Sequence, residues 1–196
     1  SKNKETSLIR IIDEFSLKDA EQIKKIEAKT NHDVKAVEIF IGKKLESLNL
    51  KKFSEFVHLF CTSEDINNLS YNLMLKGYLD NEFKEINSLL LKDLKSKSKK
   101  WSKLSMLSFT HGQSASPTTL GKEIANFHER IKYHLNLLKS FNPSGKFNGA
   151  VGNYNAHLIT DDKVNWQSLS EKFVKSLGLN WSKYSTQIEL KDEMVT

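Results

Sequence analysis

The chain has 196 residues, with 30 Lys or Arg and 24 Asp or Glu, so its formal net charge is +6. This length suits one ordinary domain or a part of a larger protein. Arg10 and Arg130 are the only arginines, which argues against base readout or bidentate phosphate clamps. The lysines are interpreted as solvated helix surface, which also attracts small anionic metabolites.

Cysteine usage and hydropathy bear on the compartment. Cys61 is the only cysteine, so no disulfide can form within the chain and no cysteine metal cluster can be built. This favours a reducing, cytoplasmic setting. No signal-peptide pattern and no apolar run of membrane-spanning length support secretion or membrane insertion. Because the chain opens on Ser1 without an initiator methionine, we allow for residues ahead of it.

Few prolines and glycines interrupt the chain, which predicts a mainly helical protein. A first helix is expected to begin at Ser16, which can form a capping box with Asp19, and to end near residue 28. Thr30 and Asp33 repeat that pattern and predict a second helix to about residue 48.

A third helix is expected with Ser63 as its N-cap and to continue to about Lys100, since apolar residues recur mostly at steps of three and four and no proline interrupts them. A helix of roughly 35 residues spans about 50 Å at 1.5 Å per residue. Such a length exceeds what a compact domain of this size needs and predicts a long helical bundle, completed by other subunits or further helices.

A fourth helix is predicted to begin at Pro117, with Ser116 as its N-cap. Its apolar stripe continues to Leu138. Residues 141–163 lose the helical period and contain several glycines, so a loop with tight backbone is expected there. A last short helix is predicted over about residues 166–177, ending before Gly178.

Three polar clusters lie at or just before expected helix starts: TNHD (30–33), CTSED (61–65) and THGQ (110–113). Free N–H groups and the helix dipole favour a bound carboxylate or phosphate at such places. Ordinary capping is the more common use of these residue types. The placement alone therefore leaves capping and ligand binding both open.

His111 differs from the other histidines because it is expected in an irregular turn beside Gly112. A local structural role and a chemical role both fit that position. His128 and His134 are interpreted as helix-surface residues. Ser114 and Ser116 lie near His111, but the sequence has no nucleophile elbow, no HExxH, no Walker loop and no GxGxxG, and its histidine spacing does not suit zinc.

Five segments in unbroken order carry a family resemblance: KTNHDVKAVEIF, EFVHLFCTSEDINNL, THGQSASPTTLGKEIAN, KFNGAVGNYNAHL and STQIE. From about Ser16 to Gln187 the chain resembles the adenylosuccinate lyases of bacterial type, within the fumarase and aspartase superfamily. The resemblance implies an all-α, long-helix bundle, here a truncated portion. Residues 1–115 would be the end of an N-terminal helical domain, the first long bundle helix and a catalytic loop, and residues 116–196 a central bundle segment with a Gly-rich loop.

The resemblance also implies a chemistry. The family eliminates fumarate from adenylosuccinate, giving AMP, and from the succinylated aminoimidazole carboxamide ribotide, in purine nucleotide biosynthesis. It uses no metal or organic cofactor and assembles as a homotetramer with shared active sites. The expected partners are therefore a nucleotide substrate and further copies of the chain, without nucleic acid or membrane.

Individual roles follow from the matched motifs. His111 falls on the general acid, whose proton goes to the departing nitrogen. Contacts with the substrate are implied for a set of residues from three segments: Asn31, His32, Asp33, Thr62, Ser63 and Gln187. Thr62 and Ser63 would hold an anionic group, and His58 would lie close by.

The sequence departs from the family pattern in three places. The signature loop with the general-base serine and a carbanion-stabilising lysine has no counterpart in these 196 residues, and neither does an N-terminal Arg-Tyr segment that grips the phosphate. STQIELKDE also replaces a Pro-His pair that usually follows the glutamate. We therefore expect the isolated 196-residue piece to be inactive.

Two other readings belong to different functional classes. The first is a lyase-derived helical protein that has lost catalysis and serves as a structural or interaction module. The second is a basic nucleic-acid binder, for which affinity would fall steeply with salt. The candidate residues at the matched positions disfavour the first, and the absence of aromatics interleaved with arginine disfavours the second.

Overall fold

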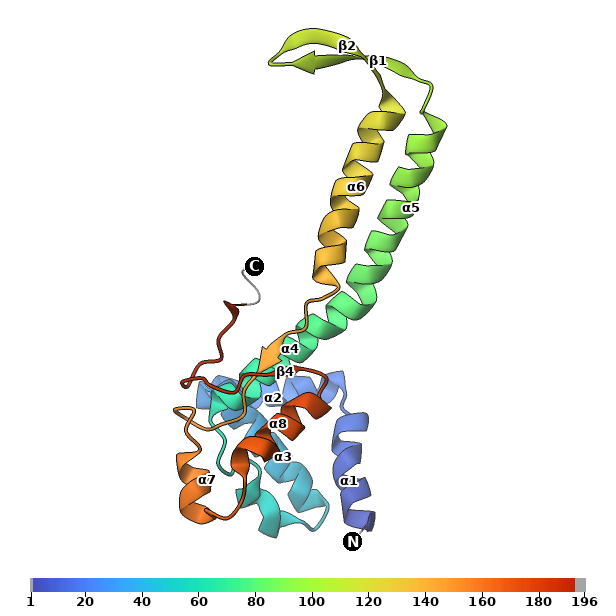
Figure 1. Cartoon of the computed structure of the whole chain (residues 1–196). Helices are drawn as coiled ribbons and strands as arrows, with labels where there is room; N and C mark the ends of the chain where they lie inside the picture. Colours follow the sequence, from blue (N-terminus) through green and yellow to red (C-terminus); the bar gives the residue numbers. More distant parts are fainter. Residues whose placement is uncertain (1, 193–196) are drawn as a thin grey trace. The chain divides into compact units, whose positions relative to one another are not determined.

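The computed structural model describes residues 2–192, and these form a mostly helical protein (Figure 1). The predicted all-α class is confirmed, with a β-hairpin and a two-residue parallel pair as additions. The chain divides into two compact units. The first consists of the residues up to Tyr71 together with Ser144–Lys191, and the second holds Asn72–Pro143. No described helix is long and apolar enough to cross a membrane.

The first unit opens with the helices α1 (Lys2–Asp13), α2 (Leu17–Thr30) and α3 (Asp33–Ser47), followed by the 3-10 helix η1 (Lys51–Phe56). The expected capping box is present, since the Ser16 hydroxyl accepts from the Asp19 N–H and the Asp19 carboxylate accepts from the Ser16 N–H. The predicted end of α2 was two residues short. α1 was not predicted.

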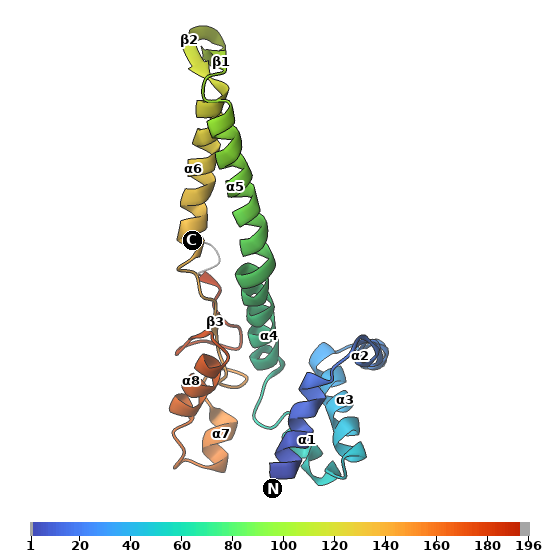
Figure 2. The same ribbon diagram turned by 90° about the vertical axis from the view of Figure 1, so that its right-hand side faces the viewer.

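The start of α3 differs from the sequence prediction. Its N-cap is His32, not Thr30, because α2 continues through Thr30 and ends on Asn31 in the left-handed region at φ 50°. α3 buries Val34, Ala36, Phe40 and Leu45. Figure 2 shows α2 end-on and α3 from the side, so the two packed helices cross steeply. Their junction therefore presents Asn31, His32 and Asp33 at a sharp corner.

The rest of the first unit packs against the beginning of α4 (Ser63–Tyr78). It contains α7 (Asn155–Thr160), α8 (Trp166–Ser176) and a parallel pair of β3 (Ser144–Gly145) with β4 (Asn180–Trp181). Leu69, Val174 and Leu179 form its buried core. The loop predicted over 141–163 is thus interrupted by β3 and α7, whereas the helix predicted over about 166–177 is confirmed.

The second unit is built on the long helix that was predicted from Ser63 to Lys100. Its helical backbone is continuous through the end of α4, a π-helical turn η2 (Leu79–Phe83) and α5 (Lys84–Lys100). α6 (Leu120–Leu138) lies beside α5 in both views (Figures 1 and 2). The two helices approach closely at Gly121, where an added Cβ would lie 2.3 Å from the Ser98 carbonyl oxygen.

A β-hairpin connects α5 to α6. Its strands are β1 (Ser105–Thr110) and β2 (Gln113–Thr119), with a register irregularity between Leu107 and Phe109. The prediction that a helix begins at Pro117 was wrong, since Pro117 pairs with Leu107 in the hairpin and the α6 N-cap is Thr119. Proline is tolerated here because each strand of a two-stranded hairpin is an edge strand.

Candidate functional site

His32 occupies the corner between α2 and α3. As the N-cap of α3, its Nδ1 accepts from the Lys35 N–H at 3.3 Å. In the neutral tautomer that leaves Nδ1 as the acceptor, Nε2 carries the hydrogen, and this atom lies 3.4 Å from the Ser63 hydroxyl. The cap therefore orients the imidazole towards the start of α4, and it links two of the three polar clusters.

Asp33 is held beside this histidine. Its carboxylate accepts from the Val34 N–H at 2.7 Å and from the Asn67 amide at 3.0 Å. The Val34 hydrogen bond is the largest cause of a lowered Asp33 pKa, aided by Asn67 and by the nearby His32. Asp33 is thus a fixed anion and hydrogen-bond acceptor at neutral pH.

An open groove of about 640 Å³ runs beside this corner. Its lining comes from the second half of α2, the two residues between the helices and the first residue of α3: Lys24, Glu27, Ala28, Asn31, His32 and Asp33. Lys24 pairs with Glu27 at 2.5 Å, so the groove carries a compensated charge pair on one wall. The imidazole of His32 and the carboxylate of Asp33 are both about half exposed beside this groove.

Thr62 and Ser63 lie at the beginning of α4, where the first N–H groups of a helix are free to bind an anion. Both side chains are partly exposed. His58 lies in the preceding turn and is half-buried. Burial raises the pKa of the neighbouring Cys61 thiol to about 11, aided by Asp65, so this thiol is protonated at neutral pH.

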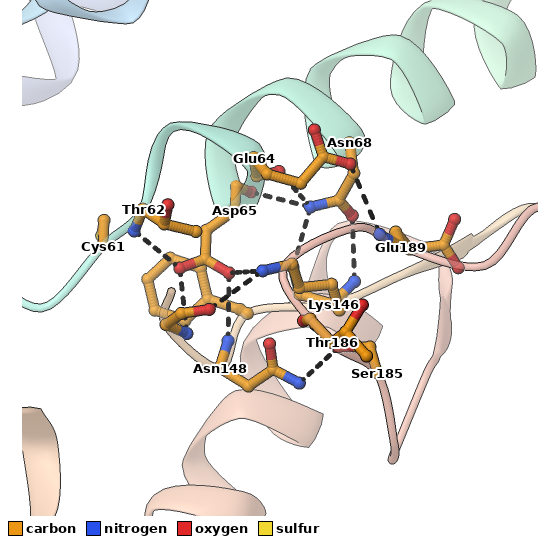
Figure 3. A network of polar contacts seen from close by, with 12 residues as sticks. Cys61, Thr62, Glu64, Asp65, Asn68, Lys146, Asn148, Ser185, Thr186 and Glu189 are labelled. Atoms are coloured by element: carbon orange, nitrogen blue, oxygen red, sulfur yellow. Dashed lines mark hydrogen bonds and ion pairs between the residues drawn. The ribbon is translucent and has the colours of Figure 1, made fainter. Parts of the chain in front are cut away.

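Beside Thr62 lies a buried polar cluster, which we call the Asp65 network (Figure 3). It comprises the side chains of Asp65, Asn68, Lys146 and Asn148 with the backbone of Thr62 and Gly149. The Asp65 carboxylate lies 2.9 Å from the Lys146 ammonium, and the two side chains are 1% and 0% exposed. It also accepts from the N–H groups of Thr62, Asn148 and Gly149 at 3.0–3.1 Å.

Asn68 and the Lys146 backbone complete this network. The Asn68 amide donates to the Lys146 carbonyl at 3.1 Å, while the Lys146 N–H donates to the Asn68 side-chain oxygen at 2.9 Å. The Lys146 ammonium further donates to the Gly149 carbonyl at 3.1 Å. The Asp65 carboxylate therefore meets four partners and the Lys146 ammonium two, in keeping with the need of buried charges for hydrogen bonds.

The segment that contains Gln187 is tied to the same network. The Asn148 amide donates to the Ser185 hydroxyl at 2.8 Å, and the Glu189 N–H donates to the Glu64 carboxylate at 3.4 Å. At Gly152 an added Cβ would lie 2.1 Å from the Ser185 carbonyl oxygen, so glycine permits this approach. Gln187 itself is exposed between the two tethered residues.

His111 lies in the second unit, at the tip of the β1–β2 hairpin. The central residues of its turn, His111 and Gly112, both have positive φ, at 49° and 74°, as a two-residue type I′ turn requires. The imidazole is exposed and makes no hydrogen bond among the described residues. It is therefore available to a ligand or a neighbouring chain.

In the first unit, five of the predicted residues surround two adjoining helix starts: Asn31, His32, Asp33, Thr62 and Ser63. Gln187 is joined to them through the Asp65 network, whereas His111 belongs to the second unit. Sequence reasoning missed Asp65, Lys146 and Asn148. Asp65 is the N3 residue of a capping pattern with Thr62, and this was the available signal. Residues 2–192 contain no group of three or more metal-ligating side chains.

Comparison with known proteins places the chain in a family. A family model described as lyase matches residues 2–196. The chain belongs to the lyase family. This lyase-family chain is 48% identical over 183 residues to the adenylosuccinate lyase of Buchnera aphidicola subsp. Acyrthosiphon pisum, covering 93% of the chain and 40% of that relative. Its identity to the adenylosuccinate lyase of Escherichia coli K12 is 47%, with the same coverage.

The lyase-family chain thus spans about 40% of the length of these relatives. Its fold is similar to that of 3-carboxy-cis,cis-muconate lactonizing enzyme from Pseudomonas putida, with a TM-score of 0.69 and 22% identity over 83% of the chain and 36% of that enzyme. A β-carboxy-cis,cis-muconate cycloisomerase from Acinetobacter calcoaceticus gives the same TM-score at 19% identity, covering 92% of the chain and 40% of that enzyme. These structures support the fold alone.

Proposed function

We propose that the chain is the central part of an adenylosuccinate lyase. The reaction is β-elimination of fumarate from adenylosuccinate, giving AMP, and from the succinylated aminoimidazole carboxamide ribotide. The observation that carries the proposal is the similarity to enzymes of that name along nearly the whole chain. The polar groups around the starts of α3 and α4 suit the binding of such an anionic substrate.

In the proposed elimination, residues of the two units have different roles. Elimination removes a proton from the succinyl carbon and breaks the C–N bond, and the departing nitrogen needs a proton. We assign delivery of that proton to His111. Negative charge that develops on the succinyl group spreads into its carboxylate, so the hydroxyl groups of Thr62 and Ser63 would stabilise it. Asn31, His32, Asp33 and Gln187 would orient the nucleotide, with His58 nearby.

The remaining expectations belong to the same proposal. The enzyme would be a cytoplasmic homotetramer that needs no metal or organic cofactor, with the domain division near residue 115. The general base and its loop would come from sequence outside the matched motifs. A polypeptide of residues 1–196 alone would therefore bind substrate weakly and not turn it over.

The test is fumarate release from adenylosuccinate by the full-length protein, measured next to the polypeptide of residues 1–196. We expect turnover by the first and none by the second. Turnover by the short polypeptide would contradict the assignment of the base. If the full-length protein neither releases fumarate nor binds an adenylosuccinate analogue that cannot undergo elimination, the enzyme proposal fails and a structural role replaces it.

A further inference from the structure

The Asp65–Lys146 ion pair is the starting point. Its atoms are 2.9 Å apart and almost fully excluded from solvent. Burying two charges is costly, and well-packed apolar residues often stabilise a fold as well or better. Stability alone therefore explains such a pair poorly. Its position, where three chain segments meet, suggests a different role.

The bonds to Asp65 fix one segment against another. Thr62 precedes α4, whereas Lys146, Asn148 and Gly149 belong to the loop after β3, yet all four donate to the same carboxylate. Movement of this loop would break three of these bonds at once. The backbone of Thr62 is thus held by a side chain whose own orientation the loop sets.

A second set of hydrogen bonds holds the third segment, which contains Gln187, against the first two. The Asn148 amide donates to the Ser185 hydroxyl, and the Glu64 carboxylate accepts from the Glu189 N–H. Gln187 lies between these two tethers. Placement of Gln187 relative to the start of α4 therefore depends on the same loop that Lys146 and Asp65 bind together.

Charge provides the second argument. The first turn of α4 carries the acidic residues Glu64 and Asp65, whose charges oppose the attraction of a helix N-terminus for an anion. The Lys146 ammonium compensates one of them at 2.9 Å. Without Lys146, the Asp65 carboxylate would lie uncompensated, 3.0 Å from the Thr62 nitrogen.

We propose that Asp65 and Lys146 are positioning residues for substrate binding. They hold Thr62, Ser63 and Gln187 in one arrangement and keep the start of α4 receptive to an anionic group of the substrate. This inference rests on the proposed lyase function. It concerns binding of the succinyl nucleotide and leaves proton delivery to His111.

The test uses steady-state fumarate release by the full-length enzyme. Lys146→Met removes the charge and keeps an unbranched side chain that is one atom shorter. We expect KM for adenylosuccinate to rise about tenfold, with a smaller change in kcat, because a lost binding interaction common to ground and transition states acts on KM. Lys175→Met is the matched control, since Lys175 pairs with Glu171 on the surface of α8, and its KM should stay within about twofold of wild type.

Coupling separates positioning from a purely structural role. Ser63→Ala should raise KM in the wild-type background and add little in the Lys146→Met background, because coupled residues are non-additive. Additive effects, or an unchanged KM in a folded Lys146→Met enzyme, would overturn the inference. If that variant does not fold, the double-mutant cycle is measured with Ser185→Ala and Gln187→Ala, in the segment that Asn148 binds. Non-additive effects on KM are again expected, and additive effects or an unchanged KM would overturn the inference. A wild-type enzyme without fumarate release would refute the lyase function itself, and this inference with it.

Discussion

The Asp65 network and the tip of the β1–β2 hairpin hold their polar residues in opposite ways. In the network, buried side chains from distant parts of the sequence fix one another through the Asp65–Lys146 ion pair and several hydrogen bonds. At the hairpin tip, the exposed His111 is positioned by the backbone of a two-residue turn. The binding groups and the proposed proton donor therefore depend on separate structural supports, so mutations should separate their effects.

The largest expected effect concerns the buried charge pair. Lys146→Met leaves the Asp65 carboxylate buried without its cation, which should lower the free energy of unfolding by about 3–5 kcal/mol. Adding Asp65→Asn removes the remaining charge and should recover part of that loss. Urea denaturation of the full-length single and double variants measures both. A double variant less stable than the single one would show that the charge is not the cause.

His111→Ala tests the other side of the comparison. We expect a loss of about 100-fold or more in kcat of the full-length enzyme, because the departing nitrogen would lose its proton donor. The melting temperature should hardly change, since the imidazole is exposed and makes no hydrogen bond among the described residues. Steady-state kinetics and thermal denaturation check the two parts. A near-normal rate would end the assignment of His111.

A smaller effect is expected where α5 and α6 meet. At Gly121 an added Cβ would lie 2.3 Å from the Ser98 carbonyl and 2.6 Å from the Ser102 backbone, so Gly121→Ala should destabilise the protein by about 1–3 kcal/mol. Gly77→Ala is the matched control, because nothing lies within 4 Å of its added Cβ. That variant should be neutral or slightly stabilising. Equal losses in both variants would contradict this packing explanation.

The smallest expected effect is a pH dependence beside the network. His157 is buried, and its ring lies 5.0–5.4 Å from those of Phe60, Tyr154 and Trp166. Burial lowers its pKa below the usual 6.5, against an opposing effect of Asp65. As the pH falls below about 6.5, the unfolded chain therefore binds the proton first, and stability decreases.

His157→Phe removes this titration while keeping an aromatic ring. Urea denaturation at pH 7.5 and pH 5.5 should show a smaller loss of stability in the variant than in wild type. His134→Phe, a change on the solvent side of α6, is the control and should keep the wild-type pH dependence. The same pH dependence in all three proteins would exclude His157 as its source.

The long helices were predictable from sequence because their evidence is local. The capping box at Ser16 and the apolar periodicity after Ser63 each report on neighbouring residues. A helix start was wrongly predicted within the strand 113–119 because Ser116 and Pro117 suit a helix start as well as an edge strand. The pair of β-branched residues that follows and the His-Gly turn were the competing evidence for a hairpin.

Candidate residues near helix starts were also found from local patterns, whereas their support was not. Lys146 stands 81 positions from Asp65 in the sequence and lies in a glycine-containing segment that offers no periodicity. Only the fold brings the two together. The N-cap of α3 was predicted at Thr30 but is His32 for a similar reason. The local pattern does not show that α2 continues through Thr30, and this end of α2 places His32 at the cap.

The π-helical turn at Leu79–Phe83 has a consequence for the long helix as a whole. A π turn accommodates one residue more than an α-helical turn does, so every later side chain is rotated by about 100° around the axis relative to its place in an unbroken α-helix. The face that α5 offers to α6 is thus set by a single surplus position in the turn directly before α5. Loss of one amino acid there would let an unbroken α-helix form, and it would turn a different stripe of α5 towards its neighbour.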